Sequence, residues 1–178
     1  MSQSVAGRQD AAKTVSVVDP PAMEVDAFLA DDAETAGGKI YALGIGWNTL
    51  HASTFPIVHP RMTLALVVSV PYTETNEPHR LSVHLEDADG SRVRIDPGGA
   101  GRGSEEGAVL ELSVDLNVGR PAQLAAGDEQ LVPIAMRMDG LYFERPNRYV
   151  WVISVDGQEM KRLPLRVAQA GRPGPHVA

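Results

Sequence analysis

A regular alternation of apolar and polar residues over positions 108–118 constrains the fold more than any other feature of the sequence. Ala108, Leu110, Leu112, Val114, Leu116 and Val118 are interleaved with Val109, Glu111, Ser113, Asp115 and Asn117. Successive side chains of a β-strand point to opposite faces, so a period of two predicts a strand that is buried on one face. Shorter runs of the same kind begin at Met23 and Val132. The central part of the chain is therefore predicted to be β.

Two other segments are apolar at nearly every position. Residues 62–70 end at Pro71, and residues 148–155 are followed by Asp156-Gly157 and a further alternating run over 160–167. Proline cannot donate to a β-ladder, and Asp-Gly is a strong hairpin signal. We expect a central strand at 62–70 and a hairpin that joins the two later runs. Asp89-Gly90 predicts another hairpin, between Leu81–Glu86 and the segment that holds Val93 and Ile95.

Residues 39–47 predict a strand with one bulky face and one bare face. Tyr41, Leu43, Ile45 and Trp47 lie on the first face, and Gly44 and Gly46 lie on the second. A bare strand face accepts a neighbouring side chain or opens a shallow groove, and an aromatic ring beside a groove can stack on a ligand. Gly44, Gly46 and Trp47 are therefore candidate ligand-binding residues.

About nine such strands, separated by turn residues and without a helical pattern, predict an all-β fold. We expect an antiparallel β-sandwich, immunoglobulin-like or jelly-roll-like, with a closed barrel as the alternative. The domain is expected to span residues 22–168. Residues 1–21 and 169–178 lack an apolar face, so we expect a disordered leader and a disordered tail. The glycine-rich residues 96–107 are expected to be a surface loop.

The composition limits location and partners. The chain has 178 residues, no cysteine and a formal net charge of -7. A cysteine-free sequence favours the cytoplasm, and scattered cations do not predict a nucleic-acid surface. No stretch reaches the roughly 18 to 20 apolar residues of a membrane helix. We expect no nucleic acid and no membrane as partners.

No residue pattern points to catalysis. The five histidines are not spaced as metal ligands, and the acidic run Asp31, Asp32 and Glu34 is expected to be a turn rather than a calcium site. The glycines of residues 98–103 are not followed by a lysine, and no serine lies in a nucleophile elbow. We expect no enzyme activity, no metal and no cofactor.

A possible interface comes from the two strands that are apolar on both faces. Ala65 and Val67 lie opposite the core-facing residues of one strand, and Val150 and Val152 do so on the other. If the two strands share a sheet, these four side chains form one outward apolar patch that a partner could cover. The alternative is that residues 121–130 of the same chain cover it.

Three segments carry a resemblance to known proteins: Leu29–Glu34 with Gly37–Trp47, Thr73–Arg80 with Leu85–Gly90, and Arg145–Trp151 with Val155–Gly157. They resemble a family of short bacterial and phage-encoded proteins that is known only as a domain of unknown function. The resemblance covers residues 23–167. It implies a compact β-domain and brings no functional residues with it.

A weaker resemblance concerns Pro146-Asn-Arg-Tyr149, which is similar to the tyrosine corner of immunoglobulin-like sandwiches. It gives Tyr149 and, in the strand that follows, Trp151 structural roles.

Together these features favour a non-enzymatic binding or structural module, such as a component of a phage-derived or other multi-subunit assembly, with a protein partner or a second copy. The alternative function is the binding of a small ligand or a carbohydrate.

Overall fold

The computed structural model describes residues 22–95 and 108–171. They form ten strands of four residues or more, two strands of two residues and one 3-10 turn, η1 (Tyr72–Glu74). The strands are β1 (Glu24–Ala30), β2 (Asp32–Ala36), β3 (Lys39–Leu43), β4 (Thr49–Ala52), β5 (Ile57–Pro71), β6 (Pro78–Glu86), β7 (Arg94–Ile95), β8 (Ala108–Val109), β9 (Glu111–Asn117), β10 (Glu129–Phe143), β11 (Asn147–Val155) and β12 (Gln158–Gln169).

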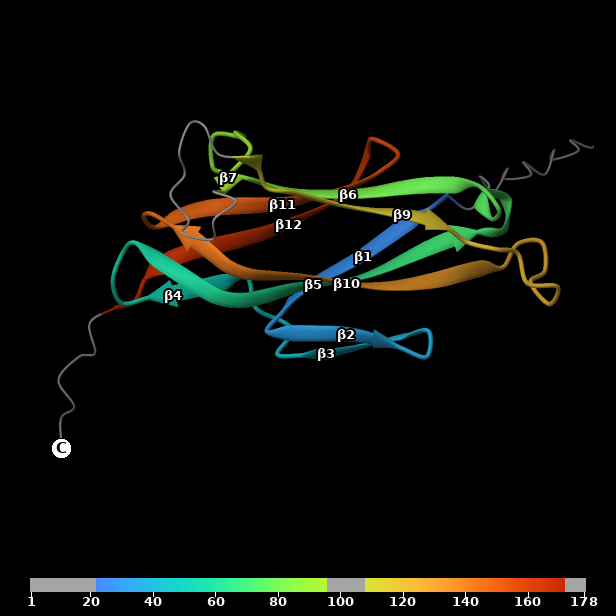
Figure 1. The fold of residues 1–178 in the computed structure, drawn as a ribbon, viewed down its shortest axis with the longest axis horizontal. Coiled ribbons are helices and arrows are strands. Elements are labelled where there is room, and N and C mark those ends of the chain that lie inside the picture. The colour runs from blue at the N-terminus through green and yellow to red at the C-terminus, as the bar shows by residue number, and fades with distance from the viewer. Residues whose placement is uncertain (1–21, 96–107, 172–178) are drawn as a thin grey trace, which may run out of the picture.

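The longer strands make two sheets. One has the order β1-β5-β10 and is antiparallel, and the other has the order β4-β12-β11-β6-β9, in which only β4 and β12 run parallel. Figure 1 shows these sheets as two layers, with the hairpin β2–β3 on the far side of the three-stranded sheet. Asp26 on β1 and Lys161 on β12 form an ion pair of 3.7 Å that connects the two sheets.

One hydrophobic core lies between the two sheets. The alternation of the sequence produces it, because every second residue of each strand faces the opposite sheet. Trp151 of β11 is fully buried in this core, as are Leu66 of β5 and Leu81 of β6. Side chains of intermediate burial close its margins, including Trp47 and Ile134.

Several of the strands predicted from the sequence are confirmed. The apolar run at 62–70 lies in β5, the central strand of its sheet, and β5 ends at Pro71. The turn Asp156-Gly157 joins β11 to β12, and both turn residues have positive φ angles, 52° and 82°. Aspartate and glycine are among the residues that best accept this conformation.

The strand predicted for residues 39–47 is too long. β3 ends at Leu43, because Gly44 and Gly46 have φ angles of 66° and 98°, which take the chain out of the extended conformation. The acidic run expected to be a turn instead contributes Asp32 and Glu34 to β2. Tertiary pairing with β3 overrides the turn preference of these acidic residues.

The hairpin predicted at Asp89-Gly90 is much shorter than expected. Its arms are joined by one bridge, between Glu86 and Arg92, and by two hydrogen bonds, from the Asp87 amide to the Ser91 carbonyl and from the Val93 amide to the Leu85 carbonyl. β7 then pairs with β8 rather than with β6. Both edges of β6 are already occupied, by β11 and β9. The predicted leader, the glycine-rich loop and most of the predicted tail lie outside the described residues.

The all-β class is confirmed, and no α-helix occurs in the part of the chain that the structure describes. The strand number differs from the nine predicted, since β2 and β4 were not foreseen and the alternating run at 108–118 divides into β8 and β9 at Leu110.

Burial distinguishes two leucines that stability measurements can compare. Leu66 is completely buried and Leu131 of β10 is 62% exposed. Leu66→Ala should lower the free energy of unfolding by about 2 to 5 kcal/mol, because it leaves a cavity in a packed core. Leu131→Ala should change it by less than about 0.5 kcal/mol. Urea unfolding monitored by tryptophan fluorescence measures both, and equal losses would show that the core is misplaced.

Candidate functional site

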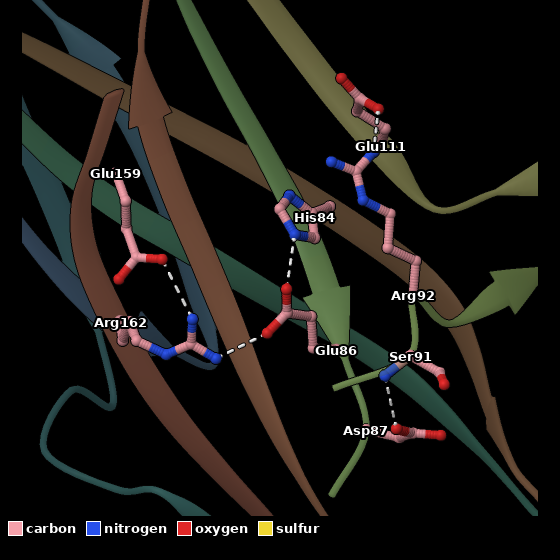
Figure 2. A network of polar contacts seen from close by, with 8 residues as sticks. All are labelled: His84, Glu86, Asp87, Ser91, Arg92, Glu111, Glu159 and Arg162. Atoms are coloured by element: carbon pink, nitrogen blue, oxygen red, sulfur yellow. Dashed lines mark hydrogen bonds and ion pairs between the residues drawn. The ribbon is translucent and has the colours of Figure 1, made fainter. Parts of the chain in front are cut away.

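Paired charges occupy the outer face of the five-stranded sheet. Arg162 of β12 binds Glu86 of β6 at 2.6 Å and Glu159 at 3.0 Å, and the second oxygen of Glu86 lies 3.1 Å from Nε2 of His84. Figure 2 shows these side chains as one continuous network across β6 and β12. Arg92 and Glu111 form a further pair at 3.2 Å beside it.

The network holds its central carboxylate in the charged form. The hydrogen bond from Arg162 lowers the pKa of Glu86, with a further contribution from His84, and outweighs the opposing effect of burial. The same bond raises the pKa of Arg162. Exposed ion pairs contribute at most about 1 kcal/mol each, so the effect on this face is to fix the side chains rather than to add much stability.

Val150 and Val152 lie on this same outer face, away from the core. Val152 is paired with His84 on one side and Arg162 on the other, and only 3% of its surface is exposed. Long polar side chains bury apolar surface along their stems, which explains how a valine outside the core is nearly covered. Val150 is half-buried.

Ala65 and Val67 lie on the outer face of the other sheet. β5 carries them, and Ala65 is paired with Phe28 of β1 and with Ala135 of β10. The predicted single patch therefore does not form: its two halves belong to different sheets and face opposite sides of the molecule. The sequence shows that each strand is apolar on both faces, but not which sheet each strand joins.

Exposed apolar side chains gather on the side of the three-stranded sheet. Of the large hydrophobic residues described as exposed, only Val114 belongs to the five-stranded sheet. The others lie on β1, β5, β10 and the hairpin with the turn that follows it: Phe28 51%, Tyr41 54%, Leu43 72%, Ile45 56%, Val58 52% and Leu131 62% exposed. The two outer faces therefore differ in chemical character.

A groove lies between the hairpin and β10. Its volume is about 430 Å³, and its lining residues are Asp32, Ala33, Glu34, Tyr41, Leu43 and Arg137. Arg61 of β5 binds Asp32 at 3.3 Å and Asp139 of β10 at 3.0 Å, and so ties the hairpin to the sheet. Sequence reasoning missed this groove because it depends on how β2–β3 sits against a strand about a hundred residues later.

The candidate ligand residues Gly44, Gly46 and Trp47 do not form an open site. A Cβ atom at Gly44 would overlap the carboxylate of Asp31, so that side chain already occupies the bare side of the glycine. Trp47 packs against the margin of the core and lies edge-on to His59, with ring centroids 6.3 Å apart. Burial lowers the pKa of His59, and its Nε2 and the Trp47 Nε1 are buried without a hydrogen-bond partner.

Tyr149 and Trp151 both pack in the core. Phe143 contacts Tyr149 with a centroid separation of 5.1 Å. Burial raises the pKa of Tyr149, and a hydrogen bond with the Asn147 side chain partly opposes this. The assignment of Tyr149 to a tyrosine corner stays a prediction.

A buried histidine that the sequence analysis did not single out joins three segments. His79 lies at the start of β6, with Nδ1 2.7 Å from a carboxylate oxygen of Asp156 and Nε2 2.9 Å from the carbonyl oxygen of Glu74. The other Asp156 oxygen accepts a bond of 2.7 Å from the Arg80 amide. Both partners of the ring are acceptors, so only the protonated imidazole can donate to both.

The described part of the chain contains no group of three or more histidine and acidic side chains that could hold a metal ion. Among the same residues, no helix has the length and apolar character needed to cross a membrane.

Together, the paired sheets, the common core and the two unlike outer faces define an all-β domain. The chain belongs to a protein family of unknown function, DUF6941, whose profile matches residues 25–168. This confirms the resemblance to a family without an assigned activity.

No curated protein matches the chain. Among solved structures, it is similar to the Pseudomonas fluorescens alkylpurine DNA glycosylase AlkC bound to DNA containing an abasic site analog. The sequence identity is 10% and the TM-score is 0.40, and the match covers 83% of this chain and 30% of the glycosylase chain. The similarity at this level carries no functional argument.

The His79 contacts predict a pH-dependent stability. Burial lowers the pKa of His79, but the bonds to Asp156 and to the Glu74 carbonyl raise it by more, so that the net shift is upward. A raised histidine pKa stabilises the fold fully below the unfolded-state value of about 6.5, and this stabilisation is lost as the pH rises through the folded-state pKa. The hydrogen bond with His79 lowers the pKa of Asp156. The stability that the Asp156 carboxylate contributes to the fold is therefore present above about pH 3.9, and it is lost as the pH falls through the folded-state pKa.

Unfolding of wild type and His79→Ala in urea at several pH values tests this coupling. The free energy of unfolding of the variant should be lower than that of wild type by roughly 1 to 3 kcal/mol near pH 6. The difference should be smaller near pH 9, because the neutral ring of the wild type keeps only one hydrogen-bond donor. His51→Ala, at an exposed histidine of β4, controls for the removal of a histidine. A loss that is independent of pH would contradict a protonated His79.

Proposed function

We propose that the protein is a non-enzymatic binding module that docks a protein partner on the outer side of its three-stranded sheet. The difference between the two outer faces carries this proposal. On the five-stranded sheet, charged pairs such as Glu86 with Arg162 cover Val152. On the other side, Phe28 and Leu131 are more than half exposed. Exposed apolar side chains grouped on one side are typical of an interaction surface.

The two halves of the predicted interface contribute unequally to this proposal. Ala65 and Val67 form the floor of the docking surface, between Phe28 on β1 and the outer residues of β10. Val150 and Val152 lie on the opposite side and are not part of it. The partner is a second protein or a second copy of the chain, within a multi-subunit assembly such as a phage-derived one.

The proposal assigns the fold to the β-sandwich class, because two sheets enclose one core. It also keeps the cytoplasmic location expected from the cysteine-free sequence. The carbohydrate-binding alternative has less support, since Asp31 occupies the space beside Gly44 and Trp47 packs against the core.

Substitutions on the exposed apolar side test the docking surface. Phe28→Glu combined with Leu131→Glu should weaken partner binding or self-association at least about tenfold, because a buried side chain of this size contributes about 1.5 to 3 kcal/mol. Captured host proteins are identified by mass spectrometry and their affinity for each variant is then measured. Light scattering reports self-association.

Val150→Glu provides the control, since Val150 is a half-buried apolar residue on the outer face of the five-stranded sheet. It should leave binding within about twofold of wild type. Thermal melts show whether the variants remain folded. If Val150→Glu abolishes binding and the double variant retains it, the docking surface is on the other sheet.

A further inference from the structure

Neither strand of the hairpin β2–β3 contains a buried residue. Both strands have exposed or half-buried residues throughout, and a two-stranded sheet has little stability alone. It is held by the ion pair of Arg61 with Asp32 and by the hydrogen bond of 3.0 Å from the Asp31 amide to the Leu43 carbonyl. Tyr41 and Leu43 remain exposed despite these attachments.

The hairpin register places carboxylates beside apolar side chains on the wall of the groove. Glu34 is directly opposite Tyr41, and Asp32 is directly opposite Leu43. Cβ atoms of such pairs are about 4.5 to 5.5 Å apart, so each carboxylate lies alongside its neighbour. Asp32 is already bound to Arg61, whereas no ion pair engages Glu34 within residues 22–95 and 108–171.

The opposite wall does not neutralise Glu34. Arg137 of β10 lines the groove, but its guanidinium is paired with Asp139 at 3.5 Å. The groove volume of about 430 Å³ lies within the range of roughly 300 to 1,000 Å³ that is common for small-ligand sites. The groove therefore combines the Glu34 carboxylate with the exposed ring of Tyr41 and with space for a ligand.

We infer that this groove binds a lysine or arginine side chain of a partner polypeptide. The cationic group lies at the Glu34 carboxylate and against the Tyr41 ring, and the aliphatic stem packs on Leu43. A cation near a carboxylate gains charge attraction, and the same cation over a ring gains a cation–π interaction. The inference rests on the proposed function and adds the chemistry of the partner.

A polypeptide is the occupant that fits the surroundings. Arg137 and Leu131 both lie on the outer side of β10, so the groove opens on the same side as the exposed Phe28 and Leu131. One segment could place a basic side chain in the groove and apolar side chains on the sheet. The formal net charge of -7 also favours a basic partner.

Two fluorescein-labelled ten-residue peptides serve as probes, one alternating lysine with leucine and the other alternating glutamate with leucine. Fluorescence anisotropy with the full chain should show binding of the lysine peptide only. Glu34→Gln and Tyr41→Ala should each weaken it about two- to fivefold, the size of an exposed cation–π or ion-pair contact. Glu77→Gln, at an exposed acidic residue immediately before β6 of the five-stranded sheet, should have no measurable effect.

Three results would overturn the inference: equal binding of both peptides, unchanged affinity in Glu34→Gln, or the same loss in Glu77→Gln, which would indicate general attraction to an acidic protein. Thermal melts confirm that the exposed substitutions leave the fold intact. If a host partner depends on Phe28 and Leu131 but not on Glu34 or Tyr41, the groove inference fails and the proposed function stands. If no partner or self-association depends on Phe28 and Leu131, the proposed function fails.

Discussion

The core between the two sheets depends on the parity of each strand. Side chains such as Leu66 and Trp151 are completely buried because alternate residues of β5 and β11 face one another across the layers. A shift of one residue in either strand would exchange its core side chains for outward ones. The same parity determines the surfaces, because it places Val67 and Val152 on opposite outer sides.

Sequence patterns predicted this parity well and the pairing of strands less well. The alternation within β9 and β10, and the Asp156-Gly157 turn between β11 and β12, are properties of local residues. The neighbours of β5 are not local: β1 precedes it and β10 follows more than fifty residues after it ends. The predicted patch of Ala65, Val67, Val150 and Val152 failed for this reason. The sequence shows which faces of each strand are apolar, but it does not show which sheet each strand joins.

The candidate site was hidden from sequence reasoning for a related reason. Tyr41 and Leu43 were correctly placed on one bulky face of a strand, and nothing local indicated that this face would remain exposed. Glu34 was interpreted as part of a turn because acidic residues favour turns, but pairing with Tyr41 makes it part of a groove wall. His79 likewise gave no local signal, since its partner Asp156 is 77 positions away.

The pairing of β5 with β10 also determines when the proposed docking surface forms during folding. The Arg61–Asp139 contact within it closes a separation of 78 positions, whereas β11 and β12 are neighbours in the chain. Closing a long loop costs entropy before its contacts repay that cost, so such pairings slow folding. The three-stranded face is then complete only in a chain that has folded throughout. A partner that recognises this face would distinguish finished molecules from incomplete ones, and its binding would stabilise the whole domain.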